Sequence, residues 1–297
     1  MIIRILKKIF SWFKEHKLWS ILGALGIGSA TAGVGVYESH QAKKTNKKAI
    51  AIQQEAINRH EIEYNSTCQV LAELGEMEKL VVDSFPHFAD IMAQIQERPQ
   101  MKTGFFSTVK LPNYEPNEIK TMSIDMQMAI GAAGGAGIGA MAGVAAFGAG
   151  AIIAAPAMIS AGIVLCVKGV GLKKKAIENV KQAKKLRENV EEIIKFYGQL
   201  RNAASSFRAS IGAVYQKYAE YLSNVQITLQ TKSNWKEFSK AERKSTENVI
   251  LLARLLYEMC NTNVVVKSEK EDKLESINAG ELEKLEKQAV KLLAGMH

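Results

Sequence analysis

The chain contains little cysteine, little proline and few aromatic residues. Its 297 residues include 3 Cys and 5 Pro, and 7% are aromatic. Because Cys68, Cys166 and Cys260 lie about a hundred residues apart, no disulfide framework or Cys-based metal motif is indicated. The scarcity of proline, with abundant Ala, Glu, Lys, Leu and Gln, favours long helices over sheets. We therefore expect an all-α fold, an elongated helical bundle or coiled coil.

Residue types that carry catalysis are present but scattered. Carboxylate pairs such as Glu191 with Glu192 lie on helix faces, where solvated charge is the ordinary role, and no His, Cys or Ser accompanies them in a catalytic arrangement. We expect a protein that is not an enzyme, with no catalytic residues, no bound metal and no cofactor. No chemistry is assigned to the five histidines, His16, His40, His60, His87 and His297.

The most informative segment runs from Met126 to Val167, 42 residues without one charged side chain. One membrane-spanning helix needs about 20 apolar residues, so this run suits two passes and predicts a transmembrane helical hairpin over residues 126–168. Glycines recur at every fourth position, which predicts close helix packing through a glycine zipper. The alternative is a glycine-rich helix pair buried in a soluble core. The glycines of the zipper are Gly131, Gly135, Gly139 and Gly143.

The turn and the exit of this hairpin also have sequence signals. Gly148 and Gly150 can adopt the positive φ of a reversal, and Pro156 falls in the first turns of the return helix or kinks it. Basic residues follow the run and suit anionic headgroups at a membrane exit. They are Lys168, Lys173, Lys174 and Lys175.

The N-terminal region predicts a second membrane contact. Residues 1–17 form a basic amphipathic interfacial helix, and residues 18–37 a glycine-rich apolar segment that spans, dips into the membrane, or is cleaved as a signal peptide near Ala30–Ala32. Basic residues flank this segment on both sides, so the positive-inside rule does not decide the orientation. The headgroup-binding residues expected here are Arg4, Lys7, Lys8 and Lys14.

Net charge supports a lipid partner. The formal charge is +9, and much of the excess lies beside apolar segments. Basic residues in such places indicate an anionic bilayer, whereas a nucleic-acid site would need a basic face with interleaved aromatics, which we do not find. We expect no nucleic-acid partner.

Helical periodicity organises the remaining chain. Residues 41–98 predict a helical stalk that Pro86 interrupts, and residues 99–125, with their prolines and aromatics, predict an ordered loop. Residues 172–230 predict a long coiled-coil helix that pairs with residues 43–84. Its seam alternates three and four residues apart at Ala183, Leu186, Val190, Ile193, Tyr197, Leu200, Ala204, Phe207, Ile211, Val214, Tyr218, Tyr221 and Val225.

Two further regions complete the chain. Residues 231–267 predict a helix from Asn234 to Asn261, followed by a short extended segment at Val264–Val266. Residues 268–297 predict a charged linker and a C-terminal amphipathic helix. The inner face of that last helix is expected to hold Leu282, Leu285, Ala289 and Leu292.

The motifs Glu97-Arg98-Pro99-Gln100 and Val109-Lys110-Leu111-Pro112-Asn113-Tyr114, followed by Glu118-Ile119-Lys120 and the glycine-rich run, carry a resemblance. Over residues 25–200 the chain resembles a widespread group of uncharacterised bacterial proteins, some of which carry the label chemotaxis protein. The resemblance implies a bacterial origin and the same layout, but no activity. In architecture alone the hairpin is similar to apolipoprotein-L-like and α-helical pore-forming proteins.

Together these features predict a membrane-inserting protein that oligomerises with itself and permeabilises or remodels a membrane, as a pore-forming effector, toxin or defence protein. The alternative is a membrane-anchored scaffold whose long helices recruit a protein partner through residues 183–262. We expect the bacterial inner membrane as its location, with the helical body in the cytoplasm.

Overall fold

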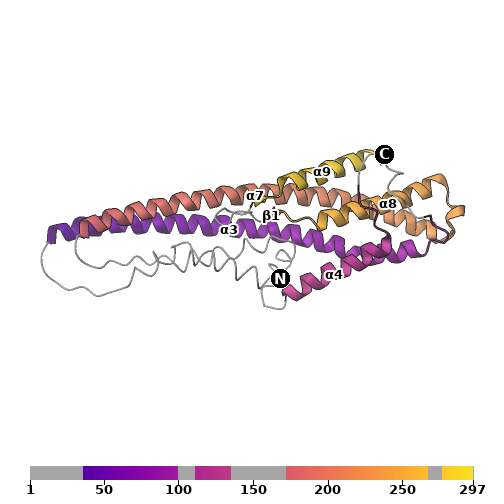
Figure 1. Ribbon diagram of the computed structural model, residues 1–297, viewed down its shortest axis with the longest axis horizontal. Coiled ribbons are helices and arrows are strands. Elements are labelled where there is room, and N and C mark those ends of the chain that lie inside the picture. The colour runs from indigo at the N-terminus through magenta and orange to yellow at the C-terminus, as the bar shows by residue number, and fades with distance from the viewer. Residues whose placement is uncertain (1–35, 100–110, 135–171, 267–275, 297) are drawn as a thin grey trace. The chain divides into compact units, whose positions relative to one another are not determined.

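The computed structural model describes residues 36–99, 111–134, 172–266 and 276–296. Helices dominate these residues, as the all-α expectation required (Figure 1). In chain order the elements are α3 (Val36–Ala93), α4 (Pro116–Gly134), α7 (Leu172–Leu229), the 3-10 helix η3 (Trp235–Glu237), α8 (Lys240–Cys260), β1 (Val265–Val266), β2 (Ser276–Ile277) and α9 (Ala279–Ala294).

The chain divides into two compact units, and α3 and α7 contribute a segment to each. The second unit also holds α4, η3, α8, α9 and the two strands. The first unit comprises Met1–Cys68, Ala151–Gln199 and Ser268–Leu274, and the second comprises Gln69–Gly150, Leu200–Lys267 and Glu275–His297.

In the first unit α3 and α7 pair in parallel. Asn179 Nδ2 donates to Asn46 Oδ1 at 3.1 Å, and further along both helices Arg59 ion-pairs with Glu191 through both guanidinium Nη atoms. Sequence numbers rise together in these contacts, so the two helices run in the same direction. The buried positions between them are mostly small, namely Ala42, Ala49, Ala56, Ala176, Ala183 and Val190.

The second unit has a larger apolar core. Its segments of α3 and α7 also run in parallel, as the ion pair of Glu73 with Arg208 and the contact of Ser84 Oγ with the Tyr218 hydroxyl show. Helix α8 adds a wide buried face from Val249 to Cys260. The large fully buried side chains that α3 and α7 contribute include Leu71, Phe85, Phe88, Leu200, Phe207 and Ile211.

The predicted long helix of residues 172–230 is confirmed as α7, which has 58 residues. Ten of its thirteen predicted seam residues are buried, from Ala183 to Val225. Leu186, Ile193 and Tyr221 are the three that stay partly exposed. The pairing with the preceding helical segment is also confirmed within each unit, although the apolar pattern did not indicate its parallel direction.

The predicted interruption at Pro86 is wrong, because α3 continues through it to Ala93. A proline inside a helix removes one backbone hydrogen bond and costs about 3 kcal/mol. Here Val82, Phe85 and Phe88 surround it in sequence, and each has an exposed fraction of 0%. Burying side chains of this size contributes about 1.5–3 kcal/mol each, so tertiary packing outweighs the local penalty.

The expected loop of residues 99–125 is wrong in its second half, where α4 begins at Pro116. Proline suits the first helical position, since its missing N–H has no intrahelical partner there. The backbone N–H of Glu115 donates to Glu118 Oε2 at 2.7 Å, and Ile119 N donates to the Glu115 carbonyl at 3.1 Å. These contacts begin the helix ten residues before the expected hairpin.

Two corrections concern the C-terminal third. The expected helix from Asn234 to Asn261 is divided, because η3 ends at Glu237 and α8 begins at Lys240. The expected extended segment is present as β1, but its antiparallel partner β2 lies in residues predicted as linker, with Val265 opposite Ile277. Helix α9 is confirmed, and the four residues predicted for its inner face are buried.

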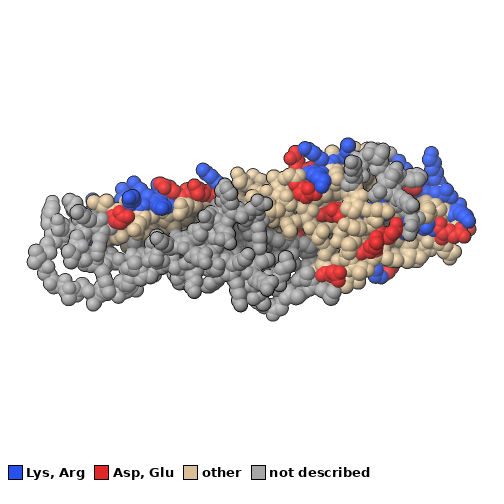
Figure 2. Space-filling view, viewed as in Figure 1, with Lys and Arg blue, Asp and Glu red and all other residues tan. Residues whose placement is uncertain are grey.

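Charged side chains lie mostly at the surface. On the face drawn in Figure 2, Lys and Arg are interspersed with Asp and Glu over the described residues. Two charged residues, Arg254 and Glu78, depart from this pattern, each with an exposed fraction of 2%. Both belong to the second unit.

Candidate functional site: the anchor of helix α4

Most residues predicted to act at a membrane lie outside the described part of the chain. Gly131 lies near the C-terminal end of α4, and Lys173, Lys174 and Lys175 lie in the first turn of α7. The structure therefore tests neither the glycine zipper nor the headgroup contacts. The residues outside the described ranges are Arg4, Lys7, Lys8, Lys14, Gly135, Gly139, Gly143, Gly148, Gly150, Pro156 and Lys168.

Among residues 36–99, 111–134, 172–266 and 276–296, no helix combines the length and the apolar character that a bilayer crossing needs.

The start of α4 is held by a buried ionic cluster in the second unit. Arg98, which follows α3, donates from Nη2 to Glu115 Oε2 at 3.0 Å. Glu115 immediately precedes α4, so this contact joins two segments that are 17 residues apart in sequence. Both side chains are largely buried, with exposed fractions of 15% and 26%. A charge pair shielded from water in this way is screened less than a surface pair.

Helix α8 completes the cluster with Arg254. Its Nε donates to the Tyr114 carbonyl oxygen at 2.7 Å, and its Nη2 lies 3.8 Å from Glu115 Oε1. Burial lowers the pKa of the Arg254 guanidinium, and the Glu115 carboxylate opposes that shift. Because a buried charge is costly unless it is paired and hydrogen-bonded, these two contacts explain how an arginine is accommodated in the apolar face of α8.

An aromatic contact packs beside the ions. The ring of Tyr114 meets the ring of Tyr257 edge to face, with centroids 5.1 Å apart. Burial, with the neighbouring Glu258 carboxylate, raises the pKa of Tyr114 to about 12. The phenol therefore stays neutral at physiological pH and acts as a packing and hydrogen-bonding group.

Further along α4, one face packs against the rest of the second unit and the other stays in water. Ile119 and Ser123 are fully buried, whereas Lys120 Nζ reaches Asp90 Oδ1 of α3 at 2.5 Å. The last charged residue of α4 is Asp125, after which the uncharged run begins within the same helix. The anchored part of α4 thus leads without a break into residues 126–134.

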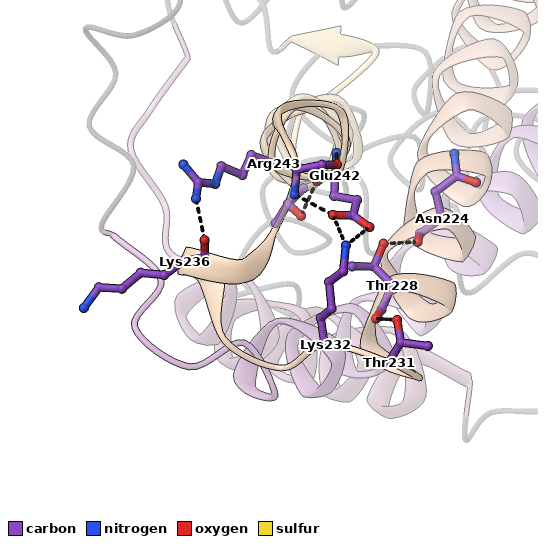
Figure 3. A network of polar contacts seen from close by, with 9 residues as sticks. Asn224, Thr228, Thr231, Lys232, Lys236, Glu242 and Arg243 are labelled. Carbon is purple, nitrogen blue, oxygen red and sulfur yellow. Dashed lines mark hydrogen bonds and ion pairs between the residues drawn. The ribbon is translucent and has the colours of Figure 1, made fainter.

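A second polar network lies at the start of α8, the helix that carries Arg254 (Figure 3). Lys232 Nζ donates to both carboxylate oxygens of Glu242 at 2.8 and 2.9 Å, while Ser239 and Glu242 form a capping box. The Lys232 ammonium, followed by the Ser239 backbone N–H, lowers the pKa of Glu242 to about 2. Arg243 donates from Nη2 to the Lys236 carbonyl at 2.9 Å. This network defines the reversal from α7 into α8.

Sequence reasoning missed the cluster, although signals for it existed. Arg254 is a single charge in the apolar series Val249–Tyr257, and an isolated charge on a buried face indicates a specific partner. Glu115-Pro116 with Glu118 three residues after Glu115 is a helix-start signal. The motifs Glu97–Gln100 and Val109–Tyr114, quoted above for the resemblance, contribute Arg98 and Tyr114 to the cluster.

The chemistry of the cluster is that of a structural anchor. Its carboxylate is compensated by guanidinium groups, and its tyrosine is neutral, so the arrangement holds charge without presenting an activated nucleophile. Within the described residues, no group of three or more His, Cys, Asp or Glu side chains could hold a metal ion.

Comparisons of the chain with protein-family models, with curated proteins and with solved structures found no match. The resemblance to the bacterial group therefore remains a prediction, and the proposals below depend on the chain's own residues.

Proposed function

We propose that the chain is a non-enzymatic membrane-inserting protein whose uncharged run, residues 126–167, enters an anionic bilayer and associates with further copies of the chain. The product of this association permeabilises or remodels the membrane. We place this activity at the inner membrane of a bacterium, with the helical body in the cytoplasm.

The observation that supports the proposal is the division of α4 into two chemically different parts. The first ten residues carry Glu118, Lys120 and Asp125 and are held to the second unit by the Arg254 cluster and Asp90. The remainder, from Met126, has no charge. A helix anchored by ions at one end and uncharged at the other is suited to carry an apolar segment to a membrane.

Glycine spacing supplies the proposed contact between copies. Gly131 lies in α4, and Gly135, Gly139 and Gly143 continue the same four-residue interval beyond it. Small residues at this spacing permit close approach of helices in lipid, where association depends on packing and not on the hydrophobic effect. Lysines 168 and 173–175 then provide positive charge for lipid phosphates.

The test compares dye release from phosphatidylglycerol vesicles by the full chain and by a Gly135→Leu, Gly139→Leu double variant. The proposal predicts that the double variant loses both chemical cross-linking into oligomers and dye release. The matched control is Gly280→Leu in α9, because Gly280 is exposed and a Cβ atom added there meets nothing within 4 Å. Full release by the double variant would remove the glycine strip from the function.

A membrane-anchored scaffold is the second candidate, and one observation favours it. Ile50, Ile62 and Ile177 of the first unit have exposed fractions of 52%, 67% and 57%, which offers apolar contacts to a protein partner. A scaffold would leave vesicles sealed and would capture a partner through its long helices. A chain that binds vesicles but releases no dye at any concentration would favour this candidate.

A further inference from the structure

A histidine is buried in the helix pair of the first unit. His60 of α3 has an exposed fraction of 3%, and its Nε2 lies 3.2 Å from the hydroxyl oxygen of Tyr197 on α7. Its ring also stacks on Tyr64, with centroids 6.2 Å apart. The two tyrosines and the histidine therefore form one aromatic contact between α3 and α7.

The packing on the N-terminal side of this contact is thin. The buried positions of α3 on its N-terminal side are Ala42, Ala49 and Ala56, with Gln53 between them. An alanine buries one methyl group, which contributes far less than the 1.5–3 kcal/mol of a buried Leu or Phe side chain. A pair held by such residues has little free energy with which to offset a buried charge.

The surroundings of His60 offer little compensation for a positive ring. On α3 the nearest charged residues in sequence are Arg59, Glu61 and Glu63, and on α7 Glu191 is engaged by Arg59. Burial lowers the pKa of His60, and the charge of Glu61 opposes that shift. Burial also raises the pKa of Tyr197 to about 12, so this hydrogen-bond partner stays neutral.

Further along α3 the first unit supplies Cys68, and α7 supplies Lys195 beside Tyr197. The thiol hydrogen-bonds with Tyr64, and burial raises its pKa, so it adds no negative charge near the ring below neutral pH. Lys195 is exposed and positive. Neither residue would stabilise an imidazolium.

The pH dependence of stability follows from the difference between the pKa of His60 in the folded chain and in the unfolded chain. An unfolded His60 binds a proton near its ordinary pKa of 6.5, whereas the folded ring resists protonation. The first unit therefore has its full stability above about pH 6.5 and loses stability as pH falls toward the lower folded pKa. Glu78 acts oppositely in the second unit, because burial raises its pKa above 4.5, with Cys260 of α8 as its titratable neighbour.

We propose that His60 is an acid-sensitive release point, whose protonation separates α3 from α7 in the first unit while the second unit stays folded. This inference rests on the proposed membrane function, for which it supplies the trigger. The segment of α7 that is released begins at Leu172, five positions after the uncharged run ends at Val167. Mild acid at an anionic membrane surface would then favour insertion.

Hydrogen exchange of the full chain at pH 7.5 and pH 5.2, corrected for the intrinsic pH dependence of exchange, tests the release. The inference predicts a loss of protection at pH 5.2 in residues 42–68 and 176–199, because the unfolded His60 then binds a proton that the folded ring resists. Residues 246–260 of α8 keep their protection. The His60→Gln variant, which keeps a hydrogen-bonding amide but cannot gain the proton, shows no such loss.

His87→Gln is the matched control. His87 is an exposed histidine of α3 that contacts Gln226, so its replacement should leave the wild-type response intact. If His60→Gln fails to fold, His60→Phe provides a second neutral ring and carries the same prediction. Equal protection of the wild type at both pH values, or equal opening of a folded His60 variant, would overturn the inference.

Dye release at the same two pH values separates this inference from the function on which it rests. Opening at pH 5.2 with vesicles that stay sealed supports the release and contradicts the membrane function. Release of dye at both pH values with unchanged protection supports the membrane function and contradicts the separation of α3 from α7. Acid-dependent release that His60→Gln abolishes supports both.

Discussion

Arg254 of α8 donates a 2.7 Å hydrogen bond to the carbonyl oxygen of Tyr114, two residues before α4 begins. The same guanidinium lies against the Glu115 carboxylate, which Arg98 also contacts. One buried side chain of α8 thus holds the segment from which α4 and the uncharged run extend. The anchor is ionic although its surroundings are apolar, so its removal should measurably lower the free energy of unfolding.

We predict that Arg254→Met lowers the free energy of unfolding of the second unit by about 3 kcal/mol. Methionine retains the apolar contacts of the stem, but the Tyr114 carbonyl loses its donor and Glu115 loses one of two cations, and breaking a buried pair typically costs this much. Urea denaturation followed by circular dichroism measures the change. Arg187→Met, at an exposed position of α7, is the control and should change the stability by less than about 0.5 kcal/mol.

A smaller effect is expected at the start of α8. Ser239→Ala removes the hydroxyl that accepts from Glu242 N at 3.3 Å, and loss of an N-cap side chain costs about 1 kcal/mol. Thermal unfolding monitors this loss. Ser205→Ala, at an exposed position within α7, has no capping role and should not lower the midpoint. A midpoint for Ser239→Ala equal to the wild type would mean that the capping box does not stabilise α8.

Replacing the buried Glu78 is expected to stabilise the second unit. Its folded carboxyl stays protonated well above its ordinary pKa of 4.5, whereas the unfolded carboxyl ionises there, so stability falls as pH rises above about 4.5. Glu78→Gln removes this penalty and should raise the free energy of unfolding at pH 8, with a smaller gain at pH 5. Glu76→Gln, at an exposed position of the same helix, should show no comparable gain. A gain that does not grow with pH would contradict the assignment.

Apolar periodicity was sufficient to predict the helices that bury one face. Ala183, Val190 and Tyr197 mark the seam of α7 in the sequence and are buried in the structure, and Leu282 and Leu285 do the same for α9. This works because a helix places every third and fourth residue on one side. The parallel direction of α3 and α7 was not predictable in this way, because the spacing of apolar residues along a helix is the same whether its partner runs parallel or antiparallel.

Other features depended on contacts between distant residues. Pro86 reads locally as a helix breaker, and only the burial of Phe85 and Phe88 explains why α3 continues. Residue Arg254 meets Tyr114 across 140 positions, a distance over which sequence spacing carries no information. Sequence spacing likewise assigns no role to His60, because its partner Tyr197 lies on another helix. Local patterns predict elements, whereas the sites depend on how those elements pack.

The central claim is that the uncharged run enters lipid, and its native cysteine, Cys166, permits a direct measurement. Cys68→Ser leaves two thiols, Cys166 and Cys260, and the full burial of Cys260 protects it from the reagent when the full chain is labelled with an environment-sensitive fluorophore. A matched chain carries the label at exposed Ala279→Cys, with Cys68 and Cys166 both replaced by serine. With phosphatidylglycerol vesicles at pH 5.2, we predict a blue shift at Cys166 and quenching by nitroxide groups on the acyl chains, with neither change at position 279. A Cys166 label that keeps its emission in water and escapes lipid quenching at every pH would contradict the account.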